Sequence, residues 1–276
     1  MVDFLIFTSI RYDPELLKAP DLGFTNIGWN SESSPFYMLD FHRDRMLKAA
    51  IHWGWTAAIT SISGKEGLEN LQNFLWGVTS DVVNGPHRLM ITLARDGSLG
   101  YDISPLPGTH LNNLHPEYLP SHSSDSEFSA SVKEAKVLIR DPVYDIFLDS
   151  QETSKSEFTH YKTTFRDMYN DARRRAQVNP GDKKEVLLVN DDGHIMEGTI
   201  STPYFWRGGK WVTPPVPREF NAFHGSGGND GTTRRWALQR NLATEEVIIA
   251  NSLMDGEECW ISNGLRGFIC GKVKLQ

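Results

Sequence analysis

The stretch GNDGTTRR, residues 228–235, runs directly into WALQRNLA at 236–243, which has helical character. Glycines let successive backbone N–H groups converge on one point, and a helix start adds unpaired donors and the positive end of a dipole. The hydroxyls of Thr232 and Thr233 would supply further donors. The stretch therefore has the composition of a phosphate-binding loop, although it lacks the spacing and the lysine of a P-loop. A surface loop that ends at a helix cap explains the same residues, so both interpretations stay open at this point.

The composition limits the class of protein. The chain has 276 residues, 39% of them hydrophobic, with eight tryptophans and a formal net charge of -7. This length suggests two domains or one large one, and the acidic balance argues against nucleic acid as the main partner. The two cysteines, Cys259 and Cys270, form neither a disulfide framework nor a metal site, and they suit a reducing compartment.

No segment has the pattern of a membrane anchor or leader. The opening stretch MVDFLIFTSIRYDP has a short apolar run, an acidic start and no basic region, so a strand is expected there rather than a signal peptide. No apolar run reaches the roughly 20 residues that are needed to span a bilayer. We therefore expect a cytoplasmic protein without a membrane partner.

Hydrophobic periodicity and turn residues predict a mixed α/β chain. Strands are expected at 4–12, 135–139, 246–250, 259–263 and 268–274, hairpins at 87–103, 185–199 and 201–214, and helices from about 40, within 65–84, at 160–177 and from about 232. Residues 103–131 are rich in Pro, Ser, His and Asn, as in an interdomain connection. We therefore expect a smaller N-terminal domain at 1–125 and a larger C-terminal domain at 126–276.

Three further stretches carry residues suited to chemistry. Lys162, in HYKTTFRDMYNDARRRA, is expected at the entry to a helix, where burial in a cleft would make its amine nucleophilic and able to form a Schiff base. Glu197 is expected at the end of a partly buried strand, where its carboxylate needs a cationic partner. His42 and Arg45 would share one helix face, and the arginine could clamp a phosphate. The alternatives are an ordinary surface lysine for Lys162, a salt bridge with an arginine for Glu197, and a solvated first helical turn for His42 and Arg45.

Taken in order, these motifs resemble the class IV pyridoxal-phosphate enzymes, which are the aminotransferases and lyases of fold type IV. The resemblance extends from Thr8 to about Val273. It rests on FTSIR at 7–11, FHRDR at 41–45, HYKTT at 160–164, NDDGHIMEGT at 190–199, TPP at 213–215, GNDGTTR at 228–234 and ISNGLRG at 261–267. Several motifs in the family's order are far more specific than any one of them.

The resemblance implies a cofactor, pyridoxal 5'-phosphate, and a role for each matching residue. Lys162 matches the catalytic lysine that holds the cofactor as a Schiff base. Glu197 matches the carboxylate that bonds the pyridine nitrogen. Arg45, Thr232 and Thr233 match the positions that bind the phosphate. The resemblance also implies a homodimer that acts on a small amine or amino acid.

The branch of the family is indicated by ISNGLRGFI near the C-terminus and by the motifs around Arg11 and Lys162. They are similar to fungal aminodeoxychorismate lyase-like proteins, which implies conversion of 4-amino-4-deoxychorismate to 4-aminobenzoate and pyruvate. Arg11 and Arg266 are candidates to hold a substrate carboxylate, with structural pairing as the alternative for Arg11. Thr8 is a candidate proton donor to the leaving group.

Two other functions remain open from the sequence. One is a transaminase of the same fold that acts on D-amino acids or (R)-amines, and the other is a non-catalytic member of the family. The residues 21–35, DLGFTNIGWNSESSP, form a longer insertion before His42 than most members have. We expect this insertion to shape or cover the active site.

Overall fold

The computed structural model describes all residues except 1–2, 25–27, 31, 82–84, 122–137 and 276. The chain divides into two compact units. Unit 1 comprises Met1–Thr109 together with Tyr161–Phe165, and unit 2 comprises His110–His160 together with Arg166–Gln276. The boundary expected between residues 125 and 126 lies outside the described residues. Lys162, expected in the C-terminal domain, is grouped by its contacts with unit 1.

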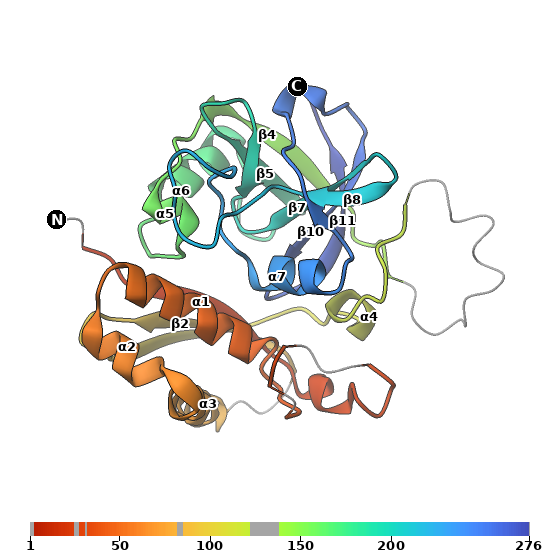
Figure 1. Cartoon of the computed structure of the whole chain (residues 1–276). Coiled ribbons are helices and arrows are strands. Elements are labelled where there is room, and N and C mark those ends of the chain that lie inside the picture. Colours follow the sequence, from red (N-terminus) through yellow and green to blue (C-terminus); the bar gives the residue numbers. More distant parts are fainter. Residues whose placement is uncertain (1–2, 25–27, 31, 82–84, 122–137, 276) are drawn as a thin grey trace. The chain divides into compact units, whose positions relative to one another are not determined.

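Unit 1 is an antiparallel three-stranded sheet with helices (Figure 1). Its strands lie in the order β1-β2-β3, and its helices follow β1 in the chain. The elements are β1 (Ile6–Tyr12), α1 (Leu39–His52), α2 (Thr56–Ile62), α3 (Gly64–Thr79), β2 (His87–Leu93) and β3 (Leu99–Pro105). The expected hairpin at 87–103 and the helices near Asp40 and within 65–84 are confirmed.

Unit 2 is built on a mixed sheet of eight strands in the order β6-β5-β4-β11-β10-β7-β8-β9 (Figure 1). The described elements are α4 (Leu111–Leu114), β4 (Tyr144–Glu152), α5 (Glu157–His160), α6 (Asp167–Arg175), β5 (Lys184–Val189), β6 (Ile195–Gly198), β7 (Thr202–Arg207), β8 (Lys210–Thr213), α7 (Thr232–Gln239), β9 (Thr244–Glu245), β10 (Glu258–Asn263) and β11 (Gly267–Val273). The expected hairpins at 185–199 and 201–214, the helix from 232 and the last two strands are confirmed.

The helix expected at 160–177 is wrong in its first part. Residues 161–166 are not helical, and they separate α5 from α6. Their backbone instead forms hydrogen bonds with the start of β1. Phe7 N donates to Lys162 O over 3.1 Å, and Thr164 N donates to Leu5 O over 2.9 Å. A residue in an α-helix could not make these bonds, because its N–H and C=O groups point along the helix axis.

The strand expected at 246–250 is also wrong. In this part of the chain β9 ends at Glu245, and Ala250 begins a short 3-10 helix. The segment makes scattered contacts with strand ends: Glu246 N donates to Thr213 O, Ile195 N donates to Ile248 O, and Ile249 forms an isolated bridge with His194. These contacts do not extend into continuous strand pairing along residues 246–250. Of the strand expected at 135–139, residues 135–137 lie outside the described residues, and residues 138 and 139 are not in a strand.

The turn from β6 to β7 is closed by a buried carboxylate. Glu185 of β5 is 1% exposed. It accepts hydrogen bonds from Thr199 N at 3.0 Å, Thr199 Oγ1 at 2.5 Å and Ser201 Oγ at 2.6 Å. A Cβ at Gly198 would lie 2.9 Å from Glu185 Cδ, so the turn has room only for glycine there. This clamp fixes the backbone immediately after Glu197.

The clamp makes the stability of unit 2 depend on the Glu185 charge. We expect Glu185→Gln to lower the free energy of unfolding by about 2–4 kcal/mol, because one carboxylate oxygen becomes an amide that faces other donors. Urea titration followed by circular dichroism measures the loss. The matched control is Glu246→Gln, whose ion pair with Lys210 at 3.3 Å is exposed on both sides and should contribute less than about 1 kcal/mol. Equal losses in the two variants would contradict the clamp.

Candidate active site

Lys162 lies in unit 1 on the segment that is hydrogen-bonded to the start of β1. Its carbonyl accepts from Phe7 N, and its Nζ lies 4.7 Å from the centre of the Phe7 ring. Tyr161, the preceding residue, stacks on His52 with ring centres 4.4 Å apart. The lysine is half-buried rather than free on the surface. The hydrogen bond from Phe7 and the stacking of Tyr161 therefore fix the backbone from which the Lys162 side chain extends.

A buried hydrogen-bond cluster joins β1 to α1 in the same unit. Thr8 Oγ1 lies 2.6 Å from His42 Nδ1, and Arg45 Nη2 donates to Thr8 Oγ1 over 2.7 Å. Arg45 Nη2 also lies 3.3 Å from His42 Nδ1. Arginine has only donors, so Thr8 Oγ1 and His42 Nδ1 both accept from Arg45 Nη2, and Nδ1, which then carries no proton, accepts from the Thr8 hydroxyl. His42 is therefore neutral, with its own proton on Nε2.

The charges around His42 favour the same neutral state. Its side chain is 1% exposed, and burial lowers its pKa well below the usual value, with further lowering by the charges of Arg45 and Lys162. Nε2 is buried and has no hydrogen-bond partner among the residues that the structure describes. The sequence placed His42 on the same face as Arg45, and its contact with Thr8 could be found only from the fold.

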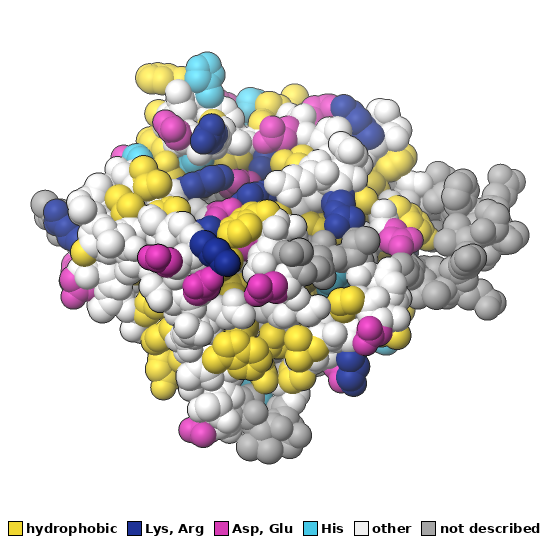
Figure 2. Space-filling model, turned by 60° about the horizontal axis from the view of Figure 1, so that its bottom comes forward, with side chains coloured by type: hydrophobic (Ala, Val, Ile, Leu, Met, Phe, Trp, Pro, Cys, Tyr) yellow, Lys and Arg dark blue, Asp and Glu magenta, His cyan; other side chains and the backbone are white. Residues whose placement is uncertain are grey.

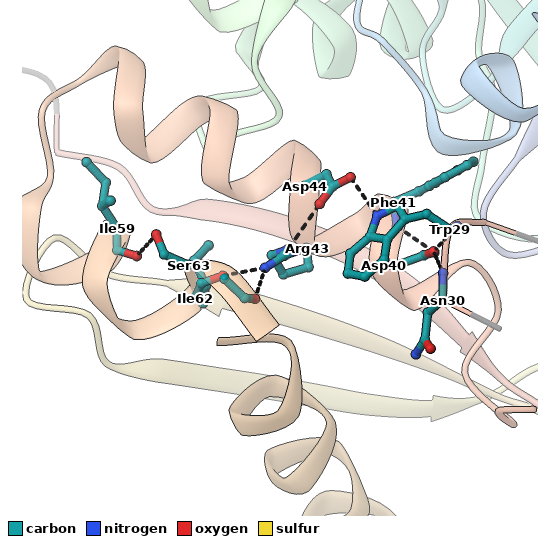
Figure 3. Close-up of polar contacts among 10 residues, drawn as sticks. Trp29, Asn30, Asp40, Phe41, Arg43, Asp44, Ile59, Ile62 and Ser63 are labelled. Atoms are coloured by element: carbon teal, nitrogen blue, oxygen red, sulfur yellow. Dashed lines mark hydrogen bonds and ion pairs between the residues drawn. The ribbon is translucent and has the colours of Figure 1, made fainter. Parts of the chain in front are cut away.

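Part of the insertion before α1 is fixed to the start of that helix (Figure 3). Trp29 N and Asn30 N donate to Asp40 Oδ2 over 2.6 and 2.9 Å, and Trp29 Nε1 donates to Asp44 Oδ2 over 3.0 Å. The Arg43 guanidinium lies over the Trp29 ring at 5.2 Å. Burial raises the pKa of Asp40, although the backbone N–H groups oppose this shift. These contacts attach the insertion to the helix that carries His42 and Arg45.

Arg11 is fully buried in unit 1, with 0% of its surface exposed. Its Nε and Nη2 donate to Asp13 Oδ2 over 2.9 and 2.7 Å, and Nη1 reaches Pro107 O and Thr109 Oγ1 at 3.3 Å. These contacts are those of the structural pairing that the sequence left open for Arg11.

In unit 2 the glycine-rich loop packs against the strand that carries Glu197. A Cβ at Gly228 would lie 2.5 Å from Met196 O and 3.1 Å from Glu197 Cβ. Gly227 has a φ of +89°, and a Cβ there would lie 3.0 Å from Met196 Cε. Only glycine permits this approach of two backbones. The structure therefore places the loop beside Glu197, although 30 residues separate the two motifs.

The loop ends at the start of α7. Gly231 is the N-cap residue of this helix and has no side chain that could cap its first N–H groups. Thr232 and Thr233 are buried in the first turn, and Thr233 Oγ1 lies 2.7 Å from Ser262 Oγ, which lies 2.9 Å from Tyr204 OH. Burial raises the pKa of Tyr204, so its phenol stays protonated. The N–H groups of a helix start and a chain of hydroxyls make this helix end suited to an anion.

A buried arginine braces the same loop. Arg234 Nη1 donates to Asp230 Oδ1 over 3.1 Å, Nη2 donates to Pro214 O over 2.9 Å, and Nη2 also pairs with Glu245. These bonds tie the loop and α7 to the end of β8 and to β9. The motifs TPP at 213–215 and GNDGTTR at 228–234 are thus connected by one guanidinium.

Glu197 itself is 9% exposed, and its Oε1 accepts a hydrogen bond from Tyr169 OH over 2.6 Å. Arg266 is half-buried in the turn between β10 and β11, where Asn263 Oδ1 accepts from Leu265 N and Arg266 N at 3.0 Å. Its guanidinium makes no hydrogen bond or ion pair with the described part of the chain. Tyr169, Tyr204 and Ser262 are polar contacts of the site that the sequence did not single out.

The predicted residues thus fall into two groups. Unit 1 brings Thr8 and Arg45 into contact with His42, whose pKa the charge of Lys162 also lowers. Unit 2 brings together Glu197, the glycine-rich loop and the two threonines.

Acidic and basic side chains are interspersed on the face in Figure 2. Among the described residues no helix is both long and apolar enough to cross a bilayer.

The fold is that of the fold type IV enzymes. A solved structure with a provisional amino-acid aminotransferase name, from Mesorhizobium loti, superimposes with a TM-score of 0.65 at 21% identity, covering 98% of this chain and 100% of its own. The sequence pattern of amino-transferase class IV matches residues 24–271. The chain therefore belongs to the class IV aminotransferase family, whose members depend on pyridoxal phosphate.

Two fungal proteins are similar to this chain in sequence. The chain is 26% identical over 206 residues to aminodeoxychorismate lyase of Saccharomyces cerevisiae, covering 69% of this chain and 52% of the relative. It is 29% identical over 138 residues to a Schizosaccharomyces pombe protein with a provisional aminodeoxychorismate lyase name, covering 48% of this chain and 56% of the relative. The chain thus spans about half the length of the curated relatives that it matches.

The neutral state of His42 has a consequence for stability. An unfolded chain binds a proton at His42 below pH 6.5, while the folded chain does not until its lower pKa is reached. Because the unfolded state binds more protons in that window, His42 makes the fold less stable as pH falls below 6.5. We expect a loss of up to about 1.4 kcal/mol per pH unit from this residue.

The variant His42→Asn removes the titration and keeps an acceptor near the position of Nδ1. We expect its unfolding free energy to fall less steeply than that of the wild type between about pH 6.5 and 5. Urea titrations at several pH values measure the slopes. His224→Asn, at an exposed histidine, is the control and should leave the wild-type slope unchanged. An unchanged slope in His42→Asn would show that His42 is protonated in the folded protein.

Proposed function

We propose that this chain is a pyridoxal-phosphate-dependent lyase that converts 4-amino-4-deoxychorismate to 4-aminobenzoate and pyruvate. The observation that carries the proposal is the contact of Gly228 with the strand at Met196 and Glu197. It joins an anion-binding helix end and a buried carboxylate within one unit, as a phosphorylated pyridine ring requires. The fungal relatives named above support this substrate and this reaction.

The donor sets present fit this cofactor. The start of α7, which follows Gly231, and the hydroxyls of Thr232 and Thr233 suit its phosphate, and Arg45 supplies a guanidinium for the same group. Glu197 suits the protonated ring nitrogen. Lys162 suits the aldehyde, since amines of lysine condense with carbonyl groups. When bound, the cofactor supplies an electron-withdrawing ring that stabilises negative charge beside the substrate nitrogen.

The residues of this chain then carry out proton transfer and positioning. Lys162 Nζ takes the proton from the amine-bearing carbon of the substrate. The bond to the enolpyruvyl oxygen breaks, and the six-membered ring becomes aromatic, so no amino acceptor is needed. The departing enolpyruvate takes up a proton and becomes pyruvate. Glu197 keeps the ring nitrogen protonated throughout, which makes the ring a better acceptor of electrons.

Of the two candidate arginines, Arg266 is the better one for a substrate carboxylate. Its guanidinium has no partner in the described part of the chain, whereas Arg11 donates to Asp13, Pro107 and Thr109. We assign Arg11 to the structural pairing. The Thr8 hydroxyl donates to His42, so we assign Thr8 to holding Arg45 and His42 in place rather than to protonating the leaving group.

A homodimer in the cytoplasm completes the proposal. The family resemblance supports the dimer, and the free, buried Cys259 and Cys270 suit a reducing compartment. Light scattering coupled to size exclusion measures the dimer directly.

Purified protein incubated with 4-amino-4-deoxychorismate and no keto acid should release equal amounts of pyruvate and 4-aminobenzoate. The same sample should absorb at about 410–430 nm, as expected for a lysine Schiff base. We expect Lys162→Ala to abolish both signals, and Lys48→Ala, on a helix of unit 1, to preserve them. The cofactor band without products would favour a transaminase, to be tested with D-alanine and an (R)-amine. Neither band nor products, with cofactor added, would leave a non-catalytic member of the family.

Arg266→Ala should lower kcat/KM for the lyase reaction by roughly 10- to 100-fold, chiefly through KM, because a charge-assisted bond to a carboxylate is lost. Steady-state kinetics against substrate concentration separate the two parameters. Arg174→Ala is the control, since that side chain is 75% exposed and pairs with Asp171 on its own helix. An unchanged KM in Arg266→Ala would remove the arginine from the substrate site.

A further inference from the structure

Tyr169 is a buried residue that the proposed reaction does not use. It lies in α6, is 4% exposed, and donates from its hydroxyl to Glu197 Oε1 over 2.6 Å. Burial raises its pKa well above the usual value, and the charge of Glu197 raises it further. The phenol is therefore the donor and the carboxylate the acceptor, and a bond of this kind is stronger than one between neutral groups.

The Tyr169 ring is held from two sides. The guanidinium of Arg166 lies 4.3 Å from the ring centre, and its Nη2 donates to Thr199 O over 2.6 Å. The ring also belongs to a buried apolar cluster that includes Met196 and Leu188. Leu188 is the strand partner of Glu197, and Met196 precedes it in β6. The hydroxyl is thus fixed relative to the backbone of Glu197.

The backbone of Glu197 is fixed as well. β5 pairs with it on one side, Glu185 clamps the turn that follows, and Gly228 packs against its Cβ. The remaining freedom lies in the side chain, whose terminal torsion is broad for glutamate. The strong bond from Tyr169 to one carboxylate oxygen restricts that torsion.

We propose that Tyr169 is a positioning residue for Glu197, whose hydroxyl holds the carboxylate in the orientation that meets the ring nitrogen of the cofactor. The inference rests on the proposed function, because it assumes that Glu197 binds that nitrogen. A carboxylate has about four acceptor sites, so a bond from Tyr169 leaves capacity for the ring N–H. A satisfied core tyrosine would make the same bond without affecting binding, and binding therefore separates the two roles.

The variant Tyr169→Phe removes the hydroxyl and keeps the ring between Arg166 and the apolar cluster. We expect the dissociation constant for pyridoxal phosphate, measured by equilibrium dialysis of the full chain, to rise roughly three- to thirtyfold. Tyr144→Phe is the matched control, at a buried tyrosine of the same unit that belongs to a different apolar cluster. It should change the constant less than twofold. Circular dichroism and melting temperature verify that each variant is folded.

A double-mutant cycle shows whether Tyr169 acts through Glu197. In a Glu197→Gln background, Tyr169→Phe should change the dissociation constant less than twofold, because the carboxylate that it positions is gone. The same three- to thirtyfold loss in both backgrounds would overturn the positioning role. If the wild type binds the cofactor and Tyr169→Phe binds equally well, this inference alone fails. If the wild type binds none, the proposed function fails with it.

Discussion

The backbone pairing of Lys162 with Phe7 is the constraint on which the candidate site depends. It takes a short segment that lies between two helices of unit 2 in the sequence and attaches it to β1 of unit 1. A lysine side chain has many rotamers, so its amine is useful only if its backbone is fixed. The pairing achieves this without a helix or a continuous strand. It also leaves the Lys162 side chain beside the Phe7 ring.

The positive charges of Arg45 and Lys162 both act on His42, and this histidine is neutral in the fold. Arg45, Thr8 and His42 form one hydrogen-bonded set in which every donor direction is determined by the arginine. A protonated His42 would place a third cation beside Arg45 and Lys162 in a buried position. The same cluster joins β1 to α1, so the electrostatic arrangement and the packing of unit 1 share the same residues.

Unit 2 relies on close backbone contact rather than on charge. The approach of Gly228 to β6 brings the helix end at α7 and the carboxylate of Glu197 into one region, and Glu185, Arg234 and Tyr169 hold its edges. Each of these three side chains is buried and hydrogen-bonded to a residue that is distant from it in the chain. Rigid support of this kind is what a binding site needs in order to lose little entropy when a ligand arrives.

The sequence by itself determined the family, the hairpins and the identity of the main polar residues, because these depend on local patterns and on motif order. The helix from Thr232, the turn at Asp96 and Gly97, and the strand that carries Glu197 near its end follow from spacing alone. Only the tertiary structure decided that residues 161–166 are not helical, that Arg11 pairs with Asp13, and that Tyr169 reaches Glu197. These outcomes depend on contacts between residues that are distant in the chain or on which groups are buried together, and neither is written in a local pattern.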